Sequence, residues 1–191
     1  ETGRGALDGA DLLSEAPSSY NSSIEYPEDN PIAQSLKGIA QVANAKLGTR
    51  IFYAQHGSFD THAGELFNHA KLWKDLSDAL GDFFEDLKEH GRQNDVTVLL
   101  FSEFGRRIED NGSGTDHGSG GVAFILGGSV KGGFYGEQPS LELSEQVEGD
   151  MKYNNDFRST YATLLDQWMG IDSVPILGKN YEQFNFINKG T

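Results

Sequence analysis

Two short apolar runs constrain the fold of this chain more than any other feature. They are VTVLLF at residues 96–101 and VAFILGG at residues 122–128, and polar residues bound both of them. Continuous apolar runs of this length are typical of strands that are buried on both faces, as in parallel sheets. A third segment, RIFYAQ at residues 50–55, also has strand character. The sequence therefore predicts three neighbouring, mostly buried strands of one sheet.

Segments with helical spacing of apolar residues lie around these strands. The clearest is 65–90, where one apolar stripe runs from Leu66 to Leu87 and ends before Gly91. A second helix is expected from Pro31, with Asn30 as its N-cap and Gly48 at its end, and a third near 156–170. Strands that alternate with helices indicate an α/β fold with a largely parallel sheet.

The domain plan follows from these elements. We expect a single α/β domain over residues 31–189, after an irregular lead-in at 4–30 that is rich in Ser, Asn, Pro and acidic residues. ETG at 1–3 and GT at 190–191 are interpreted as remnants of a secretion vector. The protein would then be exported, to the periplasm or the extracellular space. The triplets that begin at Asn21 and Asn111 would be glycan acceptors.

Composition excludes several classes of function. Acidic residues outnumber basic residues by 29 to 15, and the net charge of −14 argues against nucleic acid and anionic membranes as partners. The 191 residues include no cysteine, so a disulfide and a thiolate metal site are both excluded. No apolar run reaches about 18 residues, the length needed to span a membrane.

The segment HGSFDTHAG, which follows the strand predicted at 50–55, contains a candidate metal-binding pair. Asp60 and His62 are two residues apart, and in extended backbone such residues point to the same side. Carboxylate oxygen together with imidazole nitrogen suits Zn, Mn or Fe. His56 is a further candidate ligand, whereas His69 and His90 are interpreted as ordinary surface residues. The alternative for the pair is a turn with an exposed Asp60 and with His62 capping the next helix.

Two more segments near strand ends carry candidate residues. In NGSGTDHGSGG, Asp116 and His117 are adjacent, and a glycine-flanked turn would allow them to converge on one ligand. A plain acidic surface loop is the alternative. In SEFGRR, Glu103 is a candidate base or ligand, and Arg106 is suited to hold phosphate or sulfate. The alternative there is a surface ion pair.

All three segments adjoin predicted strands. In open α/β sheets, ligands bind at the carboxyl ends of the strands. We therefore expect Asp60, His62, Glu103, Asp116 and His117 to gather at one edge of the sheet.

Four stretches together resemble a known bacterial family. GSFDTHAGE, FSEFGRRIEDNGSGTDHGSGG, LGGSVKGGFYGEQPSL and DFRSTYATLLDQWMG are similar to the closing half of the domain of unknown function numbered fifteen hundred and one. The resemblance covers about residues 32–177. That family is placed in the alkaline phosphatase and sulfatase-like superfamily, so the resemblance implies a doubly wound sheet and a metal-centred hydrolytic site.

The resemblance also implies roles for individual residues. Asp116 and His117 match a superfamily pair that binds one of two metal ions, and Asp60 and His62 are the candidates for the second ion. The expected cofactor is a divalent metal, with Zn, Mn and Ca left open, and the expected substrate is a small anionic ester. The segment that supplies a further Asp ligand and the nucleophile in the superfamily is not found here. We therefore expect weak or no catalysis from this chain, and partners that include the missing half or another protein. A non-catalytic module that binds a cation, a glycan or a protein is the alternative.

Overall fold

The computed structural model describes residue 11 and residues 13–188, and it divides the chain into two compact units between Gln93 and Asn94. Each unit is described by itself. The expected vector remnants at 1–3 and 190–191 lie outside the described residues. Whether residues 31–189 act as a single domain stays a prediction.

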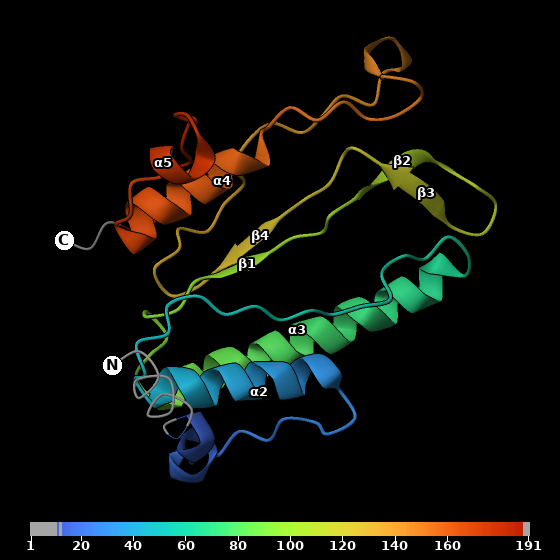
Figure 1. Ribbon diagram of the computed structural model, residues 1–191. Coiled ribbons are helices and arrows are strands. Elements are labelled where there is room, and N and C mark those ends of the chain that lie inside the picture. Colours follow the sequence, from blue (N-terminus) through green and yellow to red (C-terminus); the bar gives the residue numbers. More distant parts are fainter. Residues whose placement is uncertain (1–10, 12, 189–191) are drawn as a thin grey trace. The chain divides into compact units, whose positions relative to one another are not determined.

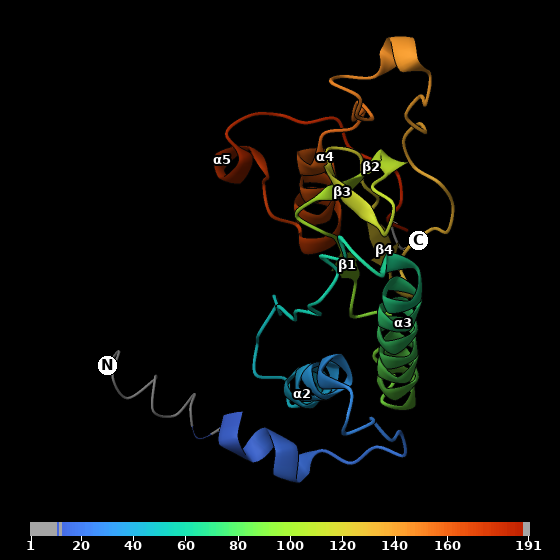
Figure 2. The same ribbon diagram turned by 90° about the vertical axis from the view of Figure 1, so that its right-hand side faces the viewer.

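The first unit is built on two packed helices, α2 (Pro31–Asn44) and α3 (Glu65–Glu89), which lie side by side (Figure 1 and Figure 2). A shorter helix at residues 13–19 lies within the segment that we expected to be irregular. Pro31 begins α2 after Asn30, as predicted, but the helix ends before Gly48. The two helices bury their apolar faces, and the residues that form this core are Ile32, Ala33, Leu36, Ala40, Leu76, Ala79, Leu80, Phe83 and Leu87.

The apolar stripe of α3 is buried only toward its C-terminal end. Near the N-terminus, Leu66 is 77% exposed and Phe67 is 82% exposed. The lengths of the two helices explain the difference, because α2 has 14 residues and α3 has 25. At about 1.5 Å per residue, α2 is too short to cover the whole of α3.

The predicted strand at 50–55 is not formed. These residues are extended but belong to no strand in the described part of the chain. Phe52 and Ala54 are half-buried, whereas Ile51 and Tyr53 are exposed. This alternation is that of an extended segment with one covered face, and not that of a strand buried on both faces.

The second unit contains two small antiparallel pairs of strands. β1 (Val98–Leu100) pairs with β4 (Phe124–Leu126), and β2 (Gly105–Asp110) pairs with β3 (Thr115–Gly118). The elements are therefore a mixture of helices and strands, as predicted, but the expectation of a largely parallel sheet is wrong for these strands. A parallel pair needs a crossover connection, usually a helix, between its strands. Here the chain between β1 and β4 forms the β2–β3 hairpin instead.

Helical segments and the C-terminal stretch complete the second unit. A single 3₁₀ turn (Leu143–Glu145) precedes α4 (Phe157–Thr163), which continues into a π-helical turn (Leu164–Met169) before α5 (Val174–Leu177). Asp156 caps α4, because its side chain accepts a hydrogen bond from the main-chain N–H of Arg158. The residues that form the core here are Ala162, Thr163, Phe186 and Ile187. None of the helices described is both long and apolar enough to cross a membrane.

Candidate functional site

Asp60 and His62 form a close pair on the surface of the first unit. The Nε2 atom of His62 lies 2.9 Å from Oδ1 of Asp60, and the two side chains are 48% and 61% exposed, respectively. Thr61 between them is buried. The alternation of exposed, buried and exposed residues places the acid and the imidazole on the same side of the backbone, but the backbone turns at Asp60, because the main-chain N–H of Thr61 donates to the main-chain oxygen of Phe59. Their role as a metal-binding pair stays a prediction.

Ring packing holds the loop that carries this pair against α3. The ring of Phe59 lies edge-on to the rings of His69 and Trp73, with centroid distances of 5.4 Å and 5.6 Å. His56 also contacts Phe59, and its Nε2 lies 3.2 Å from the main-chain oxygen of Leu72. His56 and His69 therefore anchor the loop to the helix, and His56 is occupied in packing.

The spacing of the pair suits a metal ion. For bonds of about 2.0–2.1 Å and tetrahedral geometry, two ligand atoms of one zinc ion lie about 3.3 Å apart. The 2.9 Å between Nε2 of His62 and Oδ1 of Asp60 is close to this value. A small opening of the two side chains would admit an ion between them. The pair therefore offers one oxygen and one nitrogen as candidate ligand atoms.

The glycine-rich stretch that includes Asp116 and His117 is a β-hairpin. Its turn lies at residues 111–114, where Asn111 Oδ1 accepts hydrogen bonds from the main-chain N–H groups of Ser113 and Gly114. Gly112 has a φ of 93°, which side chains rarely allow. The glycine and asparagine residues of NGSG thus make the turn between β2 and β3.

The expected convergence of Asp116 and His117 in a turn is wrong, because both residues lie in strand β3. Adjacent residues of a strand point to opposite faces. The Asp116 carboxylate accepts a hydrogen bond of 3.1 Å from Asn111 Nδ2, and the His117 ring stacks on Phe104. As placed in β3, the two side chains do not fit a single ion together.

Arg106, Phe104 and His117 form a stack on the hairpin. Arg106 pairs with His117 across β2 and β3. The rings of Phe104 and His117 are parallel within 8° at a centroid distance of 3.8 Å, and the Arg106 guanidinium carbon lies 5.0 Å from the Phe104 centroid. Arg106 also donates a hydrogen bond to the main-chain oxygen of Thr115. Glu103 is exposed in the loop between β1 and β2.

The predicted site residues therefore form two groups. Asp60 and His62 are paired in the first unit, and Arg106 and His117 are stacked in the second. The gathering of all five predicted residues at one sheet edge stays a prediction, because they belong to separate units.

A buried network on α3 was not predicted. Asp86 has no exposed surface, and its Oδ2 accepts hydrogen bonds from the phenols of Tyr20 and Tyr26. His90 Nδ1 lies 3.0 Å from Asp86 Oδ1, an oxygen that makes no hydrogen bond in the described part of the chain. The same nitrogen is hydrogen-bonded to the main-chain oxygen of Asp86. Glu89 accepts hydrogen bonds from Ser22 and Ser23. One sequence signal was available, because Asp86 follows Phe83 by three residues on the buried face of the helix.

The environment of this network shifts several pKa values. Burial and then the hydrogen bond to Asp86 raise the pKa of Tyr20 to about 12, and the same causes raise the pKa of Tyr26 still further. Hydrogen bonding to the main-chain oxygen of Asp86 raises the pKa of His90. Ligand atoms of Asp86, Glu89 and His90 lie within 4.8 Å of one another. Since most of these atoms already bind segment 20–26 or α3, we interpret the network as structural.

Comparison with known proteins identifies the family. The family model described as "Protein of unknown function (DUF1501)" matches residues 7–178, so the match begins within the segment that was expected to be an irregular lead-in. No curated protein and no solved structure matches the chain. The matched range covers most of the 191 residues, and the chain belongs to the DUF1501 family.

Proposed function

We propose that this chain is a divalent-cation-binding, hydrolase-like domain of the phosphatase and sulfatase type. The observation that carries the proposal is the Asp60–His62 pair, in which a carboxylate oxygen and an imidazole nitrogen lie 2.9 Å apart on an anchored, exposed loop. The family resemblance would assign a second ion to Asp116 and His117, but their side chains leave opposite faces of β3 and do not fit one ion together. The family resemblance supports an exported location and a small anionic ester as the substrate.

The proposed chemistry divides between the ion and the chain. A bound divalent ion polarises an ester oxygen and lowers the pKa of a water molecule. His62 must be neutral to bind the ion, so binding weakens as this imidazole is protonated. Arg106 would orient the anionic group of the ester, and Glu103 would act as the base. Movement of Arg106 toward an ester requires loss of its hydrogen bond to Thr115.

Turnover by this chain should be weak. A catalytic zinc ion usually has three protein ligands and one open position, so two ions would need about six protein ligands. The candidates are two carboxylate–imidazole pairs and Glu103. The opposite orientations of Asp116 and His117 in β3 reduce the useful number further. We therefore propose cation binding with little or no hydrolysis.

Calorimetric titration of the purified chain with Zn²⁺, Mn²⁺ and Ca²⁺ tests the cation site. Asp60→Asn and His62→Ala should each weaken binding by about tenfold or more, which corresponds to about 1.4 kcal/mol. Asp78→Asn is the matched control, because it removes the same charge from an exposed carboxylate on α3 and should bind normally. Equal affinities for the wild type and Asp60→Asn would exclude this pair as the site.

The alternative is an exported module that binds without catalysis. A polar cavity in the second unit favours it. Assays with p-nitrophenyl phosphate and p-nitrophenyl sulfate separate the two functions. Slow hydrolysis above the uncatalysed rate that is lost in His62→Ala or after chelation supports the hydrolase-like domain, whereas cation binding with no hydrolysis of either ester above that rate supports the binding module.

A further inference from the structure

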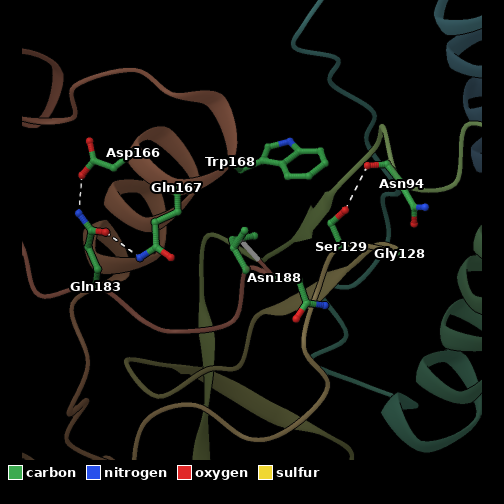
Figure 3. A pocket seen from close by; sticks show the side chains of 9 residues that line it. Asn94, Gly128, Ser129, Asp166, Gln167, Trp168, Gln183 and Asn188 are labelled. Atoms are coloured by element: carbon green, nitrogen blue, oxygen red, sulfur yellow. Dashed lines mark hydrogen bonds between the residues drawn. The ribbon is translucent and has the colours of Figure 1, made fainter. Parts of the chain in front are cut away.

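The second unit contains a cavity of about 770 Å³. This volume lies within the range of about 300–1,000 Å³ that is typical of small-molecule sites. Four amide side chains line it, together with one indole and one serine hydroxyl (Figure 3). These residues are Asn94, Ser129, Gln167, Trp168, Gln183 and Asn188. All the residues that line it belong to the second unit, whereas the Asp60–His62 pair belongs to the first.

An unusual backbone feature forms one wall. Asp166, Gln167 and Trp168 are consecutive residues of the π-helical turn Leu164–Met169, and all three line the cavity. π-helical turns are rare and occur frequently at functional sites. Gly170, with a φ of 65°, ends the turn in the left-handed region. The wide turn thus presents three successive side chains to one space.

A hydrogen-bond chain fixes the orientation of the glutamine amides. The carboxylate of Asp166, itself held by Ser173, can only accept, so the amide nitrogen of Gln183 must face it. The Gln183 oxygen then faces Gln167, whose Nε2 donates to it at 2.8 Å and to the main-chain oxygen of Phe184 at 3.2 Å. Both amides are therefore oriented by the one carboxylate.

This series of hydrogen bonds leaves one acceptor, on Gln167, without a donor among the described residues. The Oε1 atom of Gln167 is buried and accepts no hydrogen bond from the described residues. Leaving a buried acceptor unsatisfied is energetically costly. A ligand hydroxyl or N–H group that donates to Oε1 would recover that energy. The wall of the cavity therefore contains an oriented, unsatisfied acceptor, which a ligand donor reaches after a small outward shift of the Gln167 side chain.

Trp168 adds a flat apolar surface to this polar site. In Figure 3 the half-buried indole lies with the two glutamines on one side and Asn94 and Ser129 on the other. An indole face is electronegative, so it attracts the weakly positive C–H groups on one face of a sugar ring. Amides donate and accept at the same time, which matches hydroxyl groups that do both.

We propose that this cavity binds an uncharged saccharide, with a sugar ring on Trp168, a hydroxyl donating to Gln167 Oε1, and Asn188 contacting further hydroxyls. The absence of charge in the ligand follows from the lining, because Asp166 is the only charged side chain among the described lining residues, and its hydrogen bonds to Ser173 and Gln183 occupy it. The site goes beyond the proposed cation site and does not depend on it.

Fluorescence of Trp168 tests the proposal directly. The chain has two tryptophans, Trp73 and Trp168, so the Trp73→Phe variant reports on Trp168 alone. The full chain is titrated with maltose, cellobiose, lactose and chitobiose in the presence of EDTA. At least one disaccharide should give a saturable change in emission. The use of EDTA keeps this result independent of the cation site.

Variants then assign the binding to the cavity by calorimetry. Trp168→Ala should weaken binding of the active disaccharide by about tenfold or more, and Asn188→Ala by about threefold to tenfold. Asn188 is exposed, so this variant also keeps the test valid if Trp168→Ala folds poorly. Asn180→Ala, which changes an exposed asparagine outside the cavity, should bind normally.

Three results would overturn the proposal. The first is no binding of any of the four disaccharides below about 10 mM, which is a free energy weaker than about −3 kcal/mol. The second is binding that Trp168→Ala and Asn188→Ala both leave unchanged. The third is tighter binding of a sulfated disaccharide, titrated in the same way, than of any of the four uncharged disaccharides, since that would require a cationic site.

Discussion

The phenol of Tyr26 donates a 2.7 Å hydrogen bond to Oδ2 of Asp86, a carboxylate with no exposed surface. A charged group buried in this way is costly unless hydrogen bonds replace its water. Tyr20 donates to the same oxygen. The two phenols come from segment 20–26 and Asp86 comes from α3, so the network fastens this segment to the helix. Its removal should therefore loosen the first unit.

We expect Tyr26→Phe to destabilise the first unit by about 1.5–3 kcal/mol. The variant keeps the ring and removes one hydrogen bond to a buried carboxylate. A hydrogen bond to a charged group contributes about 1.5–3 kcal/mol to stability. Urea denaturation followed by the fluorescence of Trp73, in a Trp168→Phe background, measures the change. Tyr53→Phe is the matched control, because Tyr53 is exposed and its loss of a hydroxyl should change stability by less than about 0.5 kcal/mol. Equal midpoints for the two variants would contradict a structural role for the Tyr26–Asp86 hydrogen bond.

The first unit should lose stability above pH 10. The pKa of Tyr20 rises from 10.0 to about 12 on folding, so between these values the unfolded chain releases a proton that the folded chain retains. That difference favours unfolding increasingly as the pH rises through this range. The melting temperature of the wild type should therefore fall more steeply between pH 10 and pH 12 than that of Tyr20→Phe. Parallel curves for the two proteins would show that Tyr20 does not contribute.

His90 should make the first unit less stable as the pH rises through the folded pKa of its imidazole. A histidine that is buried in its neutral form would have the opposite effect. The folded pKa of His90 is raised, chiefly by the hydrogen bond to the main-chain oxygen of Asp86. A raised pKa adds stability that is fully present below the unfolded value of about 6.5 and is lost as the pH rises through the folded value. The groups that face the ring are the acids Asp86 and Glu89 and the phenol of Tyr20. Melting curves from pH 5.5 to pH 8.5 should show this loss for the wild type and not for His90→Gln.

The helices were predictable from the sequence, and the sheet was not. α3 follows from an apolar stripe with a helical period, which is a local signal. The direction in which β1 and β4 pair depends on what the chain does between them, and the runs 96–101 and 122–128 look alike in either case. The strand predicted at 50–55 was wrong for a related reason. Its residues favour extended backbone, but a strand also needs a hydrogen-bonded partner that the segment itself does not specify.

The candidate site was predictable where it depends on local geometry. Asp60 and His62 lie two residues apart, so a local turn of the backbone at Asp60 is sufficient to bring their side chains together. Asp116 and His117 were misjudged because glycine is compatible both with a ligand loop and with a hairpin turn. The Asp86 network and the saccharide cavity were missed, because each joins residues far apart in sequence. The cavity also depends on a π-helical turn, which has no simple sequence period.

The close contact between the glycines of the hairpin leads to the last prediction. A Cβ atom on Gly105 would lie 1.9 Å from the main-chain oxygen of Gly120, which accepts a hydrogen bond from the main-chain N–H of Arg106. Because backbone atoms cannot move aside as a flexible side chain can, Gly105→Ala should push β2 away from β3 and destabilise the second unit by about 1–3 kcal/mol. Gly132→Ala is the control, because no atom lies within 4 Å of its added Cβ. Urea denaturation, followed by the fluorescence of Trp168 in a Trp73→Phe background, measures the stability of both variants.

The ring protons of His117 provide a second measurement, because stacking at 3.8 Å on Phe104 shifts their NMR signals upfield, and Gly105→Ala should reduce that shift. An unchanged midpoint and an unchanged His117 signal in Gly105→Ala would contradict the requirement for glycine at this position.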